Sequence, residues 1–168
     1  MRTISYCLWF DGRAEEAADF YVSIFRNSRI VGTSRYPEGS PGEPGSVMTV
    51  EFILDGDEFL ALNGGPQYAF TPAISFVANC ETQEEIDRLW ARLTDGGQEV
   101  ACGWLTDRFG VSWQIVPTAL GEMLSSTDRD AAQRAFTAML DMKKLDIAAL
   151  RRAYEGADGS GAGASSPS

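Results

Sequence analysis

The sequence predicts an α+β protein made of tandem βαβββ modules that form an open, cup-shaped mixed β-barrel, followed by C-terminal helices. A strand, an amphipathic helix and three more strands succeed one another up to Pro66, and the same order then returns. After Pro117 apolar residues recur at helical spacing instead. Since one helix covers one face of its sheet, the opposite face must be buried by the other half, a partner chain or a ligand.

The first module begins with an expected strand over residues 3–10, whose alternation sends successive side chains to opposite faces. Asp11 is expected to cap the next helix, which has an apolar stripe ending at Phe25. Proline and glycine make 37–45 a loop, and Asp55–Asp57 a hairpin turn. Three further strands are expected, over residues 29–35, 47–54 and 58–63.

The second module repeats this order. Thr82 and Glu85 fit a capping box at the start of its helix, and Asp95-Gly96-Gly97 is expected to end it. Residues 107–110 are expected to form a turn. Its strands are expected over residues 73–78, 99–102, 104–106 and 111–116.

Helices are expected over residues 127–140 and 146–154, with Phe136 on the apolar face of the first. The remaining Gly, Ala, Ser, Asp and Pro residues predict disorder. The expected organisation is therefore a first module, a second module, a helical extension and a disordered tail, over residues 1–66, 67–118, 119–155 and 156–168.

Composition limits the possible partners. The chain of 168 residues has 14 Lys and Arg against 24 Asp and Glu, a net charge of −10, which disfavours binding to nucleic acid or anionic membranes. Three widely spaced cysteines, without a CxxC pair, argue against structural zinc and favour reduced thiols in a cytoplasmic protein. Neither a signal-peptide pattern nor a membrane-length apolar segment is present.

Four segments carry a family resemblance. They are residues 8–17 (LWFDGRAEEA), 60–66 (LALNGGP), 104–114 (WLTDRFGVSWQ) and 142–148 (MKKLDIA). Together they resemble the PhnB-like branch of the vicinal-oxygen-chelate superfamily, which includes glyoxalases, bleomycin-resistance proteins and dioxygenases. Members of the branch are often named demethylubiquinone methyltransferases. The resemblance implies a cup-shaped fold and a homodimer, for which residues 127–154 are a candidate clasp.

The resemblance also implies four inward positions that bind a divalent metal in other superfamily members. By motif these are Ser5, Ala61, Ala73 and Gln114. Alanine offers no ligand atom, serine and glutamine are weak ligands for transition metals, and the chain contains no histidine. We therefore expect neither a metal nor another cofactor.

A small-molecule binding cup is the first functional hypothesis, and strand parity is expected to place Ser5, Cys7 and Trp9 on the same inward face as Ala61 and Asn63. Several of these residues also have structural interpretations: packing for Cys7 and the tryptophans, backbone pairing for Gln114, and a linker for Asn63. The candidate ligand-binding residues are Ser5, Cys7, Trp9, Glu51, Ala61, Asn63, Ala73, Trp104 and Gln114.

The alternatives are an enzyme and a structural oligomerisation module. An enzyme would draw acid or base chemistry from Glu51, Cys7 or the loop 37–45, but the sequence assigns no catalytic residue. Lack of histidine, the usual proton shuttle near neutral pH, favours binding. Methyl transfer of the common adenosylmethionine type is disfavoured because there is no glycine-rich turn leading from a parallel strand into a helix.

Overall fold

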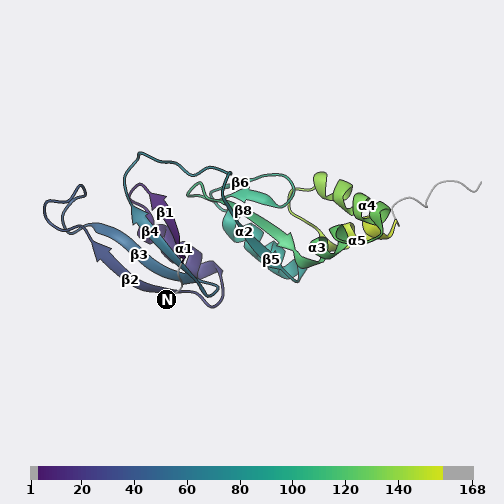
Figure 1. Ribbon diagram of the computed structural model, residues 1–168, viewed down its shortest axis with the longest axis horizontal. Coiled ribbons are helices and arrows are strands. Elements are labelled where there is room, and N and C mark those ends of the chain that lie inside the picture. Colours follow the sequence, from purple (N-terminus) through teal and green to yellow (C-terminus); the bar gives the residue numbers. More distant parts are fainter. Residues whose placement is uncertain (1–3, 157–168) are drawn as a thin grey trace, which may run out of the picture. The chain divides into compact units, whose positions relative to one another are not determined.

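The computed structural model describes residues 4–156, in two compact units that divide after Phe70. Each unit contains a four-stranded sheet, and the two sheets have the same strand order, β1-β4-β3-β2 and β5-β8-β7-β6 (Figure 1). The α+β class and the duplicated βαβββ order are confirmed, and each sheet is open rather than closed into a barrel. The helices found in residues 4–156 are all too short or too polar to cross a membrane.

Unit 1 consists of one helix packed on one face of its sheet. Its elements are β1 (Tyr6–Phe10), α1 (Ala14–Ile24), β2 (Arg29–Arg35), β3 (Val47–Leu54) and β4 (Asp57–Asn63). The core between helix and sheet contains stacked rings, with Tyr21 of α1 6.4 Å from Phe52 and Phe52 5.3 Å from Phe59. Asp55 and Gly56 both have left-handed φ values, 47° and 87°, as a tight hairpin turn requires.

The start of α1 differs from the sequence prediction. The N-cap residue is Arg13, which makes no side-chain cap hydrogen bond, whereas Asp11 lies farther upstream. Gly12 has a φ of 75°, so the chain turns between Asp11 and the helix. The first helical N–H, from Ala14, instead donates to the Asn63 Oδ1 atom at 2.9 Å. The cap is supplied by β4, 49 residues away in sequence.

Unit 2 repeats the arrangement and adds three helices. Its elements are β5 (Ser75–Cys80), α2 (Gln83–Thr94), β6 (Gln98–Glu99), β7 (Trp104–Thr106), β8 (Ser112–Pro117), α3 (Thr118–Leu124), α4 (Arg129–Leu140) and α5 (Ile147–Glu155). The predicted capping box is confirmed, because Glu85 N donates to Thr82 Oγ1 at 3.2 Å. The Glu85 carboxylate accepts in return from the backbone N–H of Glu81 at 2.9 Å.

Two predicted strands of unit 2 are displaced or shortened. Ala73 lies in a turn before β5, with its N–H bonded to Thr71 Oγ1 at 3.1 Å, so the strand begins at Ser75. The strand expected over 99–102 ends at Glu99. Cys102 and Gly103 have φ values of 59° and 82°, and this left-handed backbone cannot continue a strand.

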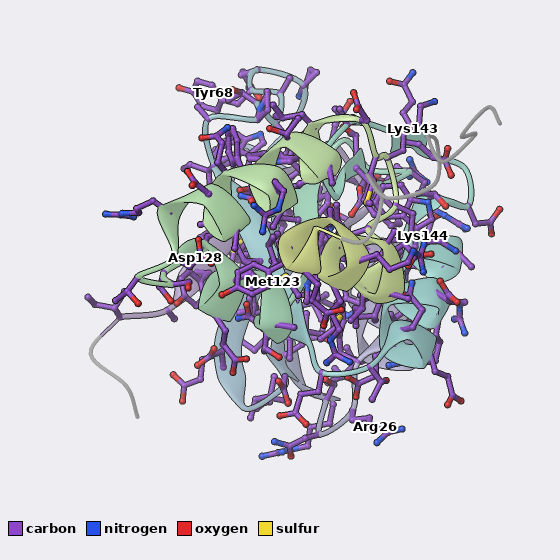
Figure 2. The ribbon with its side chains drawn as sticks, turned by 90° about the vertical axis from the view of Figure 1, so that its right-hand side faces the viewer. Arg26, Tyr68, Met123, Asp128, Lys143 and Lys144 are labelled. Carbon is purple, nitrogen blue, oxygen red and sulfur yellow. The ribbon has the colours of Figure 1, made fainter. Side chains whose placement is uncertain are left out.

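The C-terminal helices surround a small apolar core of Leu120, Met123, Ala135, Leu145 and Leu150. Figure 2 views these helices, with Met123 and Asp128 labelled among them. Helix α3 was not predicted, and Phe136, predicted on the apolar face of α4, is 40% exposed. The tail predicted to be disordered lies outside the described residues, apart from Gly156, which ends α5 in a left-handed conformation.

The extension is bound to the rest of unit 2 by polar contacts. The N–H groups of Cys102 and Gly103 donate to the carbonyls of Met142 and Lys143, each at 2.8 Å. The Gln83 side chain of α2 donates to Leu145 O at 3.1 Å and accepts from Ile147 N at 2.9 Å. These bonds make the segment leading into α5 part of unit 2.

Candidate functional site

The face of the unit 1 sheet opposite α1, which we call the open face, is the candidate site. Strand register places side chains on it in two neighbouring rows. One row contains Trp9, Leu62, Thr49 and Ser34, and the next contains Cys7, Leu60, Glu51 and Gly32. These residues are exposed or half-buried, whereas their alternating neighbours Leu8, Phe10, Val50, Phe52, Phe59 and Ala61 are buried. The open face therefore combines an apolar floor with a few polar groups.

The predicted face of β4 is wrong. Ala61 pairs with Leu8 and Asn63 pairs with Phe10, so both lie in register with the α1 side of the sheet. Ala61 is completely buried. Leu60 and Leu62 occupy the open face instead, as partners of Cys7 and Trp9. Alternation within a strand shows which residues share a face but not which face is buried. The pairing with neighbouring strands decides that, and the sequence does not give it.

Asn63 connects three parts of unit 1. Its Oδ1 atom accepts from Ala14 N at 2.9 Å, and its Nδ2 atom donates to Val47 O at 3.1 Å. Its own carbonyl accepts the Tyr36 hydroxyl at 2.5 Å. Both ends of the amide are thus bonded to backbone, and we assign Asn63 a structural role.

Replacing Asn63 with alanine is expected to lower the free energy of unfolding by about 2 kcal/mol, because a helix cap and a backbone partner are lost together. Urea denaturation measures this change. Asn63→Asp keeps the acceptor for Ala14 and loses the donor to Val47, so about half of the loss is expected. Asn79→Ala, at an exposed position on β5, is the control, and an equal loss there would contradict the assignment.

Trp9 is held in place by a glycine-rich segment. Its indole Nε1–H donates to Gly65 O at 2.9 Å, and the Tyr68 ring meets it edge-on at 5.0 Å. A Cβ atom on Gly64 would lie 2.2 Å from the indole, so only glycine allows this close approach. Because the indole N–H already donates to Gly65, Trp9 can contribute only its apolar ring surface to the site.

Cys7 lies near the middle of the open face, between Tyr6 and Leu8 on β1. Partial burial raises the pKa of its thiol above the ordinary value, although much of the residue is exposed. At neutral pH the thiol is protonated, and no described residue is a histidine that would deprotonate it. We therefore assign Cys7 a role in contacting a ligand rather than a role as a nucleophile.

Iodoacetamide is expected to modify Cys7 more slowly than glutathione at pH 8, because the raised pKa lowers the fraction of thiolate. Burial also raises the pKa of Cys80, to about 11, and we expect Cys80 to stay unmodified in the folded protein. Peptide mapping by mass spectrometry measures both rates, and denatured protein is the control. Modification of Cys7 faster than glutathione would contradict its assignment as a contact surface.

Two carboxylates share the open face. Glu51 pairs with Leu60, and Glu58 of β4 pairs with Ile53 of β3, on the same side of the sheet. A Cβ atom on Gly32 would lie 3.9 Å from Glu51 Oε2, which shows that this carboxylate extends over the neighbouring strand β2. Glu58, Leu60, Leu62 and Thr49 were not in the predicted site, and only the cross-strand register identifies them.

Unit 2 has an equivalent face opposite α2. Trp104 of β7 pairs with Gln114 of β8, which pairs with Val77 of β5, so the predicted Trp104 and Gln114 lie side by side. The Gln114 Nε2 atom donates to Ser75 Oγ at 2.9 Å, leaving the amide oxygen as an acceptor. Ala73 lies outside the strand, and Ser5 is an exposed residue immediately before β1.

A third surface is a shallow groove of about 430 Å³ along α4 and the end of α5. It is lined by Thr137, Ala138 and Ala153, among others. Its guanidinium group, from Arg134, donates to the carbonyls of Ala153 and Tyr154 at 3.1 and 2.7 Å. Because Arg134 closes the end of α5 in this way, we give the groove no binding role.

The residues available for a metal do not fit one. Within residues 4–156, no three His, Cys, Asp or Glu residues come together in a geometry that can hold a metal ion. Of the four positions that the family resemblance relates to metal ligands, Ser5 is exposed, Ala61 is buried on the α1 side, Ala73 lies in a turn, and Gln114 bonds Ser75. Zinc sites use about three protein ligands from His, Cys or carboxylates.

Comparison with known proteins identifies relatives for most of the chain. A putative 3-demethylubiquinone-9 3-methyltransferase from Bacillus cereus, a PhnB protein, is 40% identical and covers 70% of this chain and 100% of its own, with a TM-score of 0.64. A Pseudomonas aeruginosa protein is 21% identical and covers 70% of this chain and 98% of its own, with a TM-score of 0.58.

The fosfomycin resistance protein FosX from Listeria monocytogenes shares the fold at 15% identity, covering 74% of this chain and 98% of its own, with a TM-score of 0.54. No curated protein matches the chain. The family model for 3-demethylubiquinone-9 3-methyltransferase matches residues 2–116, which span both sheets nearly to the end of β8 and stop before α3. The chain belongs to this PhnB-like family, within the glyoxalase-like vicinal-oxygen-chelate fold.

Proposed function

We propose that the protein binds a small organic molecule on the open face of unit 1 without a metal ion. The observation that supports this most is the composition of that face, where Trp9, Leu60 and Leu62 provide apolar surface around Glu51. Ligand sites are mostly apolar, with a small number of polar groups that fix orientation. Within residues 4–70, α1 is the only helix, and it packs on the other face.

The metal chemistry of related folds does not transfer to these residues. A FosX variant from Listeria monocytogenes has been crystallised with Mn(II) and a dihydroxypropylphosphonic acid. Manganese prefers carboxylate, carbonyl and water oxygen ligands, and zinc also accepts imidazole and thiolate. Here the positions corresponding to metal ligands carry serine, alanine and glutamine side chains. The proposed site therefore recognises its ligand by contact and hydrogen bonding.

Methyl transfer, which the family name suggests, is not the function we propose. Adenosylmethionine enzymes of the common doubly wound type use a parallel sheet with a glycine-rich turn after its first strand. Here each sheet contains one parallel pair and otherwise antiparallel pairs. The turn after β1 is Asp11-Gly12-Arg13, which contains a single glycine.

Native mass spectrometry of the protein as purified, together with elemental analysis, tests the proposal. We expect a copurifying or added organic ligand to bind while the metal content stays well below one equivalent. A stoichiometric divalent metal that survives dialysis against EDTA would contradict metal-free binding. Enzymatic turnover of a bound compound would instead support the alternative hypothesis of an enzyme.

A further inference from the structure

We propose that Asn63-Gly64 is a site of spontaneous deamidation that the fold of unit 1 keeps inactive, so that unfolding of this unit leaves a permanent chemical mark. This inference does not depend on the proposed function. The chain has three asparagines, and only Asn63 is followed by glycine, whereas Ser28 and Cys80 follow the other two. Glycine hinders attack by its own backbone nitrogen least, because it has no Cβ atom.

The reaction requires no reagent other than water. The backbone nitrogen of Gly64 attacks the Cγ atom of Asn63 and forms the new C–N bond of a succinimide ring. The bond between Cγ and Nδ2 breaks, and the amide nitrogen leaves as ammonia with the proton that the Gly64 nitrogen gives up. Water then opens the ring at either carbonyl carbon. Residue 63 becomes aspartate or isoaspartate, and in isoaspartate the Cβ atom is part of the main chain.

Two separate demands of the fold place this reactive pair at the end of β4. Asn63 caps α1 by accepting from Ala14 N at 2.9 Å. Gly64 allows the Trp9 ring to come close, since a Cβ atom there would lie 2.2 Å from the indole. Replacing either residue would remove one of these contacts. The fold therefore retains the pair, and its reactivity is limited by the surrounding hydrogen bonds.

The groups that would close the ring are all hydrogen-bonded in the folded protein. Both ends of the Asn63 amide are bonded to backbone atoms. The attacking nitrogen of Gly64 donates to Phe10 O at 3.0 Å, and the Asn63 carbonyl accepts from the Tyr36 hydroxyl at 2.5 Å. Ring closure requires rotation about the Cα–C bond of Asn63, which would break the last two bonds together. The rate of deamidation should therefore follow the population of a locally opened form.

Deamidation would damage the surroundings of Trp9. Aspartate lacks the group that donates to Val47 O, and isoaspartate lengthens the main chain directly before Gly64. The added main-chain atom would displace Gly65, whose carbonyl accepts from the indole N–H of Trp9 at 2.9 Å. A molecule that reacts while unfolded is thus expected to refold with Trp9 released from Gly65.

Peptide mapping by mass spectrometry, with separation of the aspartate and isoaspartate products, measures deamidation over time at pH 8 with and without urea. In urea we expect Asn63 to react faster than Asn27 and Asn79. In the folded protein we expect Asn63 to react at least about a hundredfold more slowly than in urea, because opening of a strand end bonded on all sides is rare. Equal rates at Asn63 with and without urea would overturn the inference, as would a faster reaction at Asn27 in urea.

Tyr36→Phe removes one restraining bond and leaves the reactive pair intact. We expect it to raise the rate in the folded protein about fivefold, as the loss of one typical hydrogen bond allows. Tyr154→Phe is the control, because its hydroxyl bonds Ser126 Oγ at 2.7 Å in unit 2, and it should leave the rate at Asn63 unchanged. An unchanged rate in Tyr36→Phe would contradict the assigned restraint. Refolded, deamidated protein should show a shifted indole N–H resonance for Trp9, and an unshifted one would contradict the expected damage.

Discussion

Replacing Asp107 with alanine is expected to lower the free energy of unfolding by about 4 kcal/mol, because three donors lose their common acceptor. The carboxylate is buried, at 3% exposure, between β7 and β8. Its Oδ1 atom accepts from Phe109 N at 2.9 Å and Val111 N at 3.0 Å, and its Oδ2 atom accepts from Trp113 Nε1 at 2.9 Å. Alanine would leave these groups unsatisfied, two of them on buried residues.

Chemical denaturation followed by circular dichroism measures this effect. Asp95→Ala is the matched control, because Asp95 accepts from Arg108 on the surface at 2.6 Å, and we expect its loss to cost less than about 1 kcal/mol. Asp107→Asn tests the geometry, because the amide keeps one accepting oxygen and places a donating NH2 group where the other oxygen accepted. A loss below that of Asp95→Ala would show that the hairpin does not depend on Asp107.

Gly64→Ala is expected to abolish ligand binding and to lower the free energy of unfolding by about 2 kcal/mol, because the added methyl group overlaps the Trp9 ring. The new Cβ would lie 2.2–2.5 Å from three indole atoms. The ring must move, which breaks its bond to Gly65 O and its edge contact with Tyr68. Gly64 does not have a left-handed φ, so the effect reports the close approach alone.

The indole N–H resonance of Trp9 measures the displacement directly, and a titration with a fragment that binds the wild-type open face measures binding. Gly121→Ala is the control, because a Cβ atom there meets nothing within 4 Å. We expect this change to raise the free energy of unfolding by about 0.5–1 kcal/mol, since alanine favours the helical conformation of α3. Unchanged affinity in Gly64→Ala, with a shifted indole resonance, would show that Trp9 does not contribute to the site.

Local signals in the sequence were sufficient for most elements. The capping box at Thr82 and Glu85, the Asp55-Gly56 turn and the repeated strand–helix order are set by neighbouring residues, and the structure confirms them. Trp104 and Gln114, two of the candidate site residues, form a cross-strand pair that the sequence alone did not predict.

Features that depend on contacts between residues far apart in the sequence could not be predicted in this way. Asn63 caps α1 from another strand, and nothing near Asp11 or Arg13 indicates this. The face of β4 depends on its parallel pairing with β1, which turns Ala61 toward α1 and Leu60 toward the open face. Helix α3 is seven residues long, too short for a clear apolar period.

The most direct test of metal-free binding on the open face is an amide chemical-shift screen of a fragment library against the wild-type chain in the presence of EDTA. We predict that binders shift residues of β1, β3 and β4, centred on Cys7, Leu60 and Glu51. Binders that appear only after Mn²⁺ or Zn²⁺ is added, or that shift residues elsewhere and leave these strands unchanged, would contradict the account.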